Sequence, residues 1–377
     1  MSKEKLNALF VTHDVGNYGA SRSLQLLIRN YHYANIDLIV DKPIRMKNDL
    51  PGIRKMFGGH VRRVLEFYLP FDDCYKGKPE GFLYSHAIRP LRTLLWKSNK
   101  GRIYAVISEG KYDFIYLNSL VLNPMIRAEY PFIIHIREIY DGSNENIIGN
   151  MKYVKGAIFI DNATREPLIN IIGKDNIIMN NPIDMTTVDE YVDSSYRFKY
   201  GDLDRNTIFS LIGVITESKG THFIINVFTK LKNDNARLLI VGKGDRKYIA
   251  TCKKLAENDN RIIFWGEEPE IQKIYRLSDY IIRGEAYQCV GRTIYEGLYA
   301  GCQVIIPGTE SRQDLIFEYE RFKNKINFYT PRSIADLLKL LEILAGKKIH
   351  DRTYLANTEE YVRSFHEFVV RTLDRSG

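Results

Sequence analysis

The sequence predicts an α/β protein built from two Rossmann-like domains, and three observations lead to this prediction. The chain has 377 residues, which is long for a single hydrophobic core. Apolar runs typical of strands alternate with segments whose apolar residues have helical spacing. The order of strand, glycine-bearing loop and helix begins at Leu9–Thr12 and recurs at Thr207–Ile212, as expected when two similar domains follow one another.

In the first half, Gly16 and Gly19 make a flexible turn after the first strand, and a helix begins at Ser21 or Ser23. Further strands are expected at Ile36–Val40, Phe114–Leu117, Phe132–His135, Ala157–Ile160 and Ile177–Met179. Helical spacing of apolar residues predicts helices around Val61, Val64, Leu65 and Tyr68 and around Ile88, Leu91 and Leu95.

The second half repeats the alternation of strands and helices. Strands are expected at Arg237–Val241, Ile262–Phe264, Tyr280–Ile282 and Val304–Ile306. Helices are expected at Thr221–Leu231, Tyr248–Glu257, Ile271–Leu277, Ile334–Leu344 and Thr358–Leu373.

The segment Asp279–Gly301 combines the features of an anion site. Its strand, Tyr280–Ile282, leads into a loop where Gly291 lets the backbone approach a ligand, and a short helix follows from Thr293. The amide N–H groups at a helix start and the helix dipole both favour an anion. Glu296, one turn into the helix, can accept two hydrogen bonds from a vicinal diol such as a ribose. Together these features describe a nucleotide site; the alternative is an ordinary strand–helix turn with a surface glutamate.

This segment resembles the sugar-nucleotide signature of glycosyltransferase family 4. The family pattern is Asp, an apolar run, a Pro-Ser-like turn, Glu, seven residues, Glu, then Ala and Gly. Without a gap it falls on Asp279, Ile281, Ile282, Gly284, Glu285, Gln288, Gly291, Glu296, Ala300 and Gly301. Gln288 departs from the pattern, because the family has Glu at that position.

The resemblance implies the GT-B fold, in which two Rossmann-like domains face each other across a cleft and the C-terminal helix crosses back to the first domain. We expect an acceptor-binding domain at residues 1–184, a connection at 185–206, a nucleotide-sugar-binding domain at 207–355 and the terminal helix at 356–377. Residues 185–206 are polar, charged and aromatic without periodicity, which favours a connection.

A cation is expected in the loop that follows the strand Thr207–Ile212. Lys219 has the position of the family's loop lysine, whose ammonium neutralises the charge that builds on a departing diphosphate. The family commonly has Arg where this chain has Val214, so a second cation is missing there, and Arg283 or Arg292 is a candidate replacement. The alternative for Lys219 is a solvated loop residue.

His135, at the end of a predicted strand, matches the histidine that the family places beside the donor sugar, although a histidine there is often structural. Strand carboxyl ends are where open α/β sheets bind ligands. The predicted catalytic residues are His135, Lys219 and Gln288. The predicted nucleotide-sugar-binding residues are Gly19, Val214, Lys219, Gly266, Gln288, Val290, Gly291, Arg292, Thr293 and Glu296.

The net charge of +8 is concentrated in one segment. Residues 41–104 contain 14 Lys or Arg and 6 Asp or Glu, an excess that equals the net charge of the whole chain. Such a segment suits an anionic membrane surface, a lipid pyrophosphate or nucleic acid, and simple solubility charge is the bland alternative. We expect an acceptor or membrane site, not a nucleic-acid site, at Arg89, Arg92, Trp96 and Lys97, with shallow insertion of Leu94, Leu95 and Trp96.

The cysteines indicate a reducing compartment, because Cys74, Cys252, Cys289 and Cys302 have no metal-ligand spacing. No metal site is expected at Asp72 and Asp73, which lack a second acidic cluster. No apolar run reaches the roughly 18 residues that a membrane span needs, and residues 1–7 are too polar for a signal peptide. We expect a cytoplasmic protein, peripheral at the inner face of the plasma membrane.

The function implied by the resemblance is that of a retaining, metal-independent glycosyltransferase of the hexosyltransferase type, without a cofactor. It would move a sugar from a nucleotide-diphosphate donor, with a UDP-sugar favoured, to a glycan or lipid-linked glycan in surface-polysaccharide synthesis. The leaving phosphate itself takes the acceptor's proton in this mechanism. Two other classes stay open: a sugar-nucleotide epimerase on the same fold, and a non-catalytic scaffold, which Gln288 and Val214 make conceivable.

Overall fold

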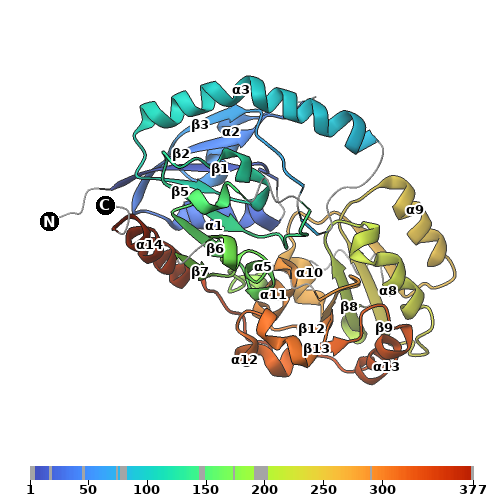
Figure 1. The fold of residues 1–377 in the computed structure, drawn as a ribbon. Helices are drawn as coiled ribbons and strands as arrows, with labels where there is room; N and C mark the ends of the chain where they lie inside the picture. The colour runs from blue at the N-terminus through green and yellow to red at the C-terminus, as the bar shows by residue number, and fades with distance from the viewer. Residues whose placement is uncertain are drawn as a thin grey trace. The chain divides into compact units, whose positions relative to one another are not determined.

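The structure is a computed structural model, and it describes residues 5–16, 19–44, 47–73, 75–76, 83–143, 149–172, 175–190, 203–288 and 291–374. The chain divides into two compact units, residues 1–182 with 357–377, and residues 183–356. Each unit is built on one parallel sheet with helices on both faces (Figure 1). Two Rossmann-like α/β units confirm the predicted fold class.

The first unit has a seven-stranded sheet in the order β3-β2-β1-β4-β5-β6-β7. Its strands are β1 (Leu6–Thr12), β2 (Ala34–Asp41), β3 (Val61–Phe67), β4 (Phe114–Leu117), β5 (Phe132–Ile136), β6 (Gly156–Phe159) and β7 (Asn176–Ile178). The strand order changes direction between β1 and β4, and open parallel sheets bind ligands at such a point.

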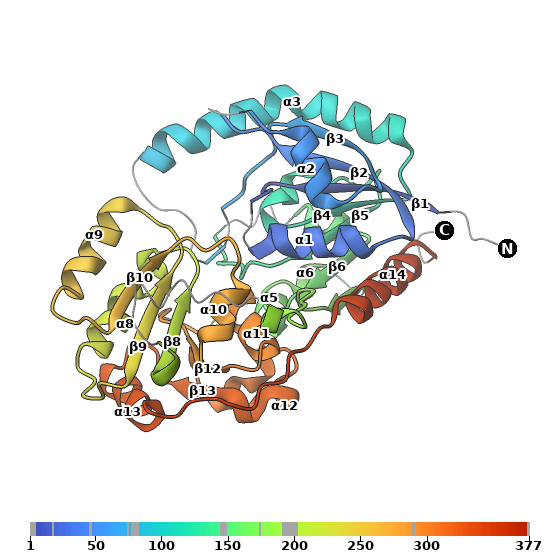
Figure 2. The same cartoon turned by 180° about the vertical axis from the view of Figure 1, so that it is seen from behind.

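The helices of the first unit cover both faces of its sheet. They are α1 (Gly19–Asn30), α2 (Leu50–Phe57), α3 (Arg89–Gly110, after the π-helical turn Tyr84–Ile88), α5 (Asn162–Arg165), α6 (Ile169–Ile172) and α14 (Thr358–Asp374). The helices α1, α2 and α14 share one core, in which Phe365 packs against Phe10 and Tyr31. The long helix α3 covers the other face (Figure 2). Its Trp96, Ile103 and Ile107 are buried in the core on that face. The C-terminal helix thus returns to the first unit, as predicted.

The second unit has a six-stranded sheet in the order β10-β9-β8-β11-β12-β13, which changes direction between β8 and β11. Its strands are β8 (Thr207–Ile212), β9 (Ala236–Val241), β10 (Ile262–Gly266), β11 (Tyr280–Ile282), β12 (Gln303–Pro307) and β13 (Ile326–Tyr329). Its helices are α8 (Thr221–Phe228), α9 (Arg246–Leu255), α10 (Gln272–Leu277), α11 (Arg292–Tyr299), α12 (Tyr319–Phe322) and α13 (Ile334–Leu344). The helices α8, α9 and α13 share one core, and α10 and α11 share the other.

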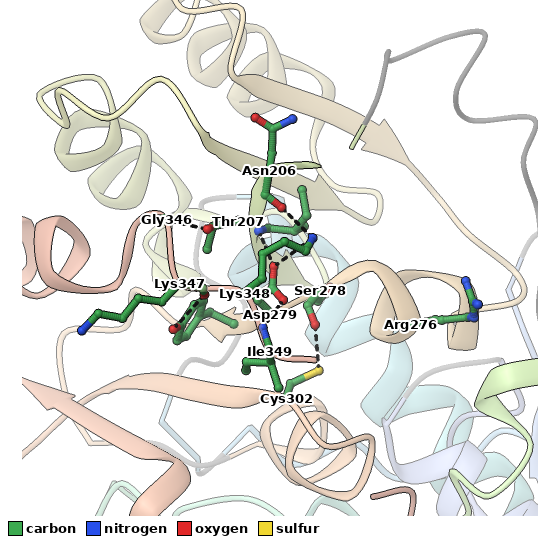
Figure 3. A network of polar contacts seen from close by, with 12 residues as sticks. Asn206, Thr207, Arg276, Ser278, Asp279, Cys302, Gly346, Lys347, Lys348 and Ile349 are labelled. Atoms are coloured by element: carbon green, nitrogen blue, oxygen red, sulfur yellow. Dashed lines mark hydrogen bonds and ion pairs between the residues drawn. The ribbon is translucent and has the colours of Figure 1, made fainter. Parts of the chain in front are cut away.

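Asp279, which precedes β11, is a structural residue at the amino end of the second sheet. Its fully buried carboxylate accepts hydrogen bonds from the backbone N–H groups of Ile208 and Ile349, both at 2.9 Å (Figure 3). Arg352 Nη2 lies 3.2 Å from the same carboxylate. Asp279 therefore ties the start of β8 and the segment after α13 to β11, away from the carboxyl ends of the strands.

The predicted helix around Val61–Tyr68 is wrong, because Val61–Phe67 forms β3. The pairing of β2 with β3 shifts register between Ile36 and Asp37, which pair with Val61 and Arg63. Arg62 is therefore an extra residue in β3, a β-bulge. A bulge interrupts the alternation of side chains along a strand, so the apolar residues acquire a spacing that imitates a helix.

Two smaller differences concern segments without a clear pattern. The strand β13 was not predicted, since its sequence INFY is short and bounded by charged residues. At the ends of the predicted connection 185–206, Met185, Val188 and Leu203 are buried in the core of the second unit.

Candidate nucleotide site in the second unit

Two cations and one carboxylate meet where the second sheet changes direction. The loop after β8 carries Lys219, and the loop after β11 carries Arg283 and Glu285. Lys219 Nζ lies 3.2 Å from Glu285 Oε1. Arg283 Nε donates to both oxygens of Glu285 at 3.1 Å, and Arg283 Nη2 contacts Oε1 as well. Both cations therefore share one carboxylate oxygen.

Two glycines allow these loops to approach. Gly220 has φ +69°, and a Cβ on it would lie 1.7 Å from the carbonyl oxygen of Gly284. A Cβ on Gly284 would lie 2.7 Å from the carbonyl oxygen of Gly220. The close contact needs glycine on both sides, and it brings together the adjoining residues Lys219 and Glu285.

The shared carboxylate is ionised. The side chains of Glu285 and Arg283 are only 1% and 7% exposed, while that of Lys219 is 42% exposed. Burial alone would raise the pKa of Glu285, but the guanidinium of Arg283 and the ammonium of Lys219 outweigh it and lower that pKa to about 2. Two positive charges thus face one negative charge, which leaves the cluster cationic.

The cluster lies against the start of α11. Arg283 Nη1 donates to Thr293 Oγ1 at 2.8 Å. A Cβ on Gly291, the N-cap of α11, would lie 3.1 Å from the same Nη1. Among the described residues no side chain caps this helix. The positive end of the helix and the two cations therefore combine into one anion-attracting place.

Tyr275 and Arg292 hold the side chain of Glu296 in place. Its carboxylate accepts from Tyr275 Oη at 2.6 Å and from Arg292 Nε at 2.8 Å, and its side chain is 1% exposed. The side chain of Arg292 is 8% exposed. Arg292 is therefore a partner of Glu296 on the same helix, one turn away, rather than a member of the Lys219 cluster.

The remaining predicted residues of this unit lie on neighbouring loops. Gln288 Nε2 donates to the carbonyl oxygen of Arg312 at 2.9 Å, so its amide joins the loops after β11 and β12. Val214 is 44% exposed after β8, and Gly266 ends β10 with φ +93°. Val290 lies outside the described residues.

His135 lies in the first unit, at the carboxyl end of β5, and is fully buried. Its Nδ1 is 2.6 Å from Tyr116 Oη and 3.1 Å from Arg137 Nη2. Because a guanidinium can only donate, Nδ1 must accept, and a neutral ring then carries its proton on Nε2. Burial and, to a smaller extent, the charge of Arg137 hold the pKa of His135 well below its usual value. Among the described residues Nε2 has no hydrogen-bond partner.

Part of the predicted acceptor or membrane site is corrected by the structure. Trp96 is 7% exposed in the core beneath α3, so it is not available for shallow insertion. Arg92 forms an ion pair with Asp41, and Arg89 Nη2 lies 3.1 Å from Asp73. These residues anchor the start of α3 to its own unit. Lys97 is exposed on the same helix, and Gly19 is the first residue of α1, with φ +24°.

Exposed apolar side chains are nevertheless present near the start of α3. They are Leu83, Ile88, Leu91 and Leu94, with exposed fractions of 68%, 37%, 42% and 64%. No helix within the described ranges is long and apolar enough to cross a membrane. The described part of the chain also contains no group of three or more His, Cys, Asp or Glu that would hold a metal ion.

Comparison with known proteins points to glycosyltransferases. Residues 192–359 match the family model described as glycosyl transferases group 1. The matched residues make up a little under half of the chain. A glycogen synthase of Thermosipho melanesiensis is 24% identical over 175 residues, which is 42% of this chain and 36% of that protein. The chain therefore matches little more than a third of the length of that curated relative.

Solved structures resemble the whole chain. Anabaena HepE in complex with UDP and glucose has a TM-score of 0.65 at 15% identity, covering 98% of each chain. Sucrose-phosphate synthase from Thermosynechococcus elongatus has a TM-score of 0.66 at 12% identity, covering 97% of each chain. At these identities the likeness shows the fold, which is that of GT-B glycosyltransferases.

Several contacts of the candidate residues were not predicted. Tyr275 and Glu285 in the second unit, and Tyr116 and Arg137 in the first, hold the predicted residues in place. Each of the first three pairs joins residues 19 to 66 positions apart, so no local sequence spacing marks them. Arg137 is the exception, since it lies two residues from His135.

Proposed function

We propose that this protein is a retaining glycosyltransferase that moves a sugar from a nucleotide-diphosphate donor to a glycan or lipid-linked glycan. The group 1 domain and the GT-B fold support sugar transfer from an activated donor. The observation that carries the proposal is the cationic cluster of Lys219, Arg283 and Glu285 beside α11. A UDP-sugar is the favoured donor, because HepE forms a complex with UDP and glucose.

The cluster is suited to a diphosphate that gains charge as the sugar departs. Lys219 supplies an exposed ammonium, and Arg283 supplies a guanidinium next to the start of α11. Arg283 is a better replacement than Arg292 for the cation missing at Val214, since Arg292 is already paired with Glu296. These cations provide the charge stabilisation that a metal-independent transfer needs, and the leaving phosphate accepts the acceptor's proton.

Glu296 is our candidate acceptor for the ribose diol. A carboxylate has about four acceptor positions, so Glu296 can accept from a ribose while Tyr275 and Arg292 fix its orientation. In the first unit, we propose that His135 donates its Nε2 proton to a substrate hydroxyl, because the Nδ1 contacts and the lowered pKa favour a neutral donor.

We also propose that the start of α3 contacts a membrane, which places surface-polysaccharide synthesis among the expected roles. Leu91 and Leu94 are exposed beside the exposed Lys97, which is the combination of apolar and basic residues that lies flat in an anionic lipid surface. Leu91 and Leu94 replace Trp96 in this role.

One observation favours a second candidate, a non-catalytic scaffold that binds nucleotide. Glu285 already forms ion pairs with the cations that a diphosphate would use. Gln288 already donates a hydrogen bond to the backbone carbonyl oxygen of Arg312. A catalytic protein must release Glu285 from Lys219 when the donor binds, whereas a scaffold need not.

Donor binding and turnover separate the two candidates. Calorimetric titration with UDP, UMP and uridine measures the diphosphate contribution, and incubation of nucleotide sugars with a membrane glycolipid extract measures transfer. Lys219→Ala should spare uridine binding and lower turnover more than donor affinity, because its charge acts on the leaving diphosphate. Lys323→Ala is the matched control, since Lys323 pairs with Glu320 on the surface of the same unit. An unchanged catalytic rate in Lys219→Ala contradicts the assignment, and no transfer from any donor by the unaltered protein favours the scaffold.

A further inference from the structure

A pocket of about 570 Å³ lies between α2 and β3 in the first unit. It is lined by Leu50, Pro51, Arg54, Lys55, Gly59, Arg62, Arg63 and Val64. Four of these eight residues are cationic and none is acidic. We propose that this pocket binds a ligand with a phosphomonoester or diphosphate group, at a site separate from the nucleotide site of the second unit.

The bulge in β3 creates one side of the pocket. Neighbouring residues in a regular strand point to opposite faces of the sheet. Because Arg62 is the extra residue at the register shift, Arg62 and Arg63 both reach the carboxylate of Asp37 on β2. Arg62 Nε lies 3.1 Å from Oδ1 and Arg63 Nε lies 2.9 Å from Oδ2. Bulges that aim side chains in this way often border binding sites.

Asp37 orients the two guanidinium groups without neutralising both. Its side chain is 4% exposed and also accepts from Tyr112 Oη at 2.6 Å. The side chains of Arg62 and Arg63 are 44% and 49% exposed. Each guanidinium has five N–H donors, and the described contacts of each use two. Donors therefore remain for an anion.

The helix α2 supplies the opposite side. Arg54 Nε donates to the carbonyl oxygen of Val61 at 2.8 Å, which holds the side chain of Arg54 against the start of β3. Lys55 follows in the same last turn, where the negative end of the helix dipole favours cations. Four cations line the pocket and no acidic residue does, so it attracts anions strongly, and it lies within the segment that carries the whole excess of positive charge.

The chemistry of the walls selects the ligand class. Arginine forks match the oxygens of a phosphate, and several cations together favour more than one negative charge. Leu50, Pro51 and Val64 offer an apolar wall to the organic part of such a ligand. The pocket lies beside the first half of β3, whereas His135 lies at the carboxyl end of β5. The pocket is therefore also separate from the candidate site at His135. A soluble phosphorylated compound and a phospholipid headgroup share this chemistry.

Arginine footprinting tests the site in the full, unaltered chain. Phenylglyoxal modifies exposed arginines, and peptide mass spectrometry reports the rate at each one separately. Pyrophosphate should slow modification of Arg54, Arg62 and Arg63 and leave Arg371, an exposed arginine of the same unit, unchanged. This readout does not depend on the second unit, so it can fail while the proposed glycosyltransferase activity holds, and the reverse.

The source of the phosphate is decided by a second arm of the same experiment. Vesicles of phosphatidylcholine, with and without phosphatidic acid, replace pyrophosphate. Protection by pyrophosphate supports a site for soluble phosphorylated ligands, and protection only by vesicles that contain phosphatidic acid supports a headgroup site. Equal rates under every condition overturn the proposal.

Matched variants test whether protection comes from the pocket. In Arg54→Ala with Lys55→Ala, the concentration of phosphate ligand that half-protects Arg62 should rise by about tenfold or more for each cation removed. Lys253→Ala with Lys254→Ala removes two cations from the last turn of α9 and should leave that concentration unchanged. The proposal is wrong if the pocket variant is protected like the unaltered protein, or if both variants lose protection equally.

Discussion

Replacing Glu285 by glutamine removes the charge that Lys219 and Arg283 share and keeps the size of the side chain. The pKa of Glu285 is lowered from 4.5 to about 2. One pKa unit corresponds to about 1.4 kcal/mol, so ionised Glu285 stabilises the folded unit by about 3 kcal/mol at neutral pH. An amide keeps one acceptor oxygen, and we expect Glu285→Gln to lower the free energy of unfolding by about 2–3 kcal/mol at pH 7.

The dependence of stability on pH provides a second, independent test of this prediction. Because the pKa of Glu285 is lower in the folded state than in the unfolded state, the unfolded chain binds more protons between the two values. The stabilisation is therefore complete above about pH 4.5 and is lost as the pH falls through about 2. The difference between parent and variant should shrink over this range.

The two tryptophans make the assay specific for one unit. Trp96 lies in the first unit and Trp265 in the second. In a Trp96→Phe background, the fluorescence of Trp265 alone follows urea unfolding of the second unit. We expect Glu285→Gln to move the midpoint to lower urea at pH 7 with an unchanged slope, since stability changes and the exposed surface does not.

The matched control is Glu320→Gln. Glu320 Oε2 lies 2.9 Å from Lys323 Nζ, but its side chain is 76% exposed, so this pair should leave the midpoint unchanged. Two results would refute the reasoning: a Glu285→Gln midpoint equal to that of the parent at pH 7, or parallel losses of stability in both proteins between pH 4.5 and the lowest pH at which the unit stays folded.

Three further predictions concern the other candidate residues. Glu296→Ala removes the carboxylate to which the buried guanidinium of Arg292 and the phenol of Tyr275 donate, so the free energy of unfolding should fall by about 3–5 kcal/mol. Calorimetry should also show weaker uridine binding, and normal binding of uridine would remove Glu296 from the site. Gln288→Glu replaces an N–H donor that faces a carbonyl oxygen, so sugar turnover should not improve, and a large gain would contradict this. Leu91→Ser with Leu94→Ser should reduce sedimentation with anionic liposomes, and undiminished sedimentation would exclude this contact.

The secondary structure could be predicted where the pattern is local. Strand β11 (Tyr280–Ile282) and helix α13 (Ile334–Leu344) have the predicted bounds, because a short β-branched run and a regular apolar stripe determine them. Strand β3 could not be predicted, since its bulge arises from pairing with β2, and the bulge gives its apolar residues the spacing of a helix. The same pairing brings Arg62 and Arg63 together at the pocket; the charge excess of residues 41–104 indicated an anion-binding segment but not this place within it.

The burial of Trp96 shows a second limit of prediction from the sequence. A tryptophan beside exposed leucines and basic residues on one helix suits a membrane surface. Which of these residues faces the sheet depends on how α3 packs, and the packing buries Trp96 while leaving Leu94 exposed. The sequence therefore could not tell which apolar residues of α3 are exposed, and contact with a membrane stays a prediction.

The choice between Arg283 and Arg292 depends on which carboxylate each one meets. Arg292 and Glu296 are four residues apart on one helix, a spacing at which opposite charges pair locally. This pair can be inferred from the sequence once the helix is placed, and it satisfies Arg292. Arg283 meets a carboxylate that it shares with Lys219, 64 residues earlier in the chain, and that meeting requires β8 and β11 to be neighbours. Because one carboxylate cannot balance two cations, Arg283 and Lys219 keep the positive charge that an anionic ligand would neutralise.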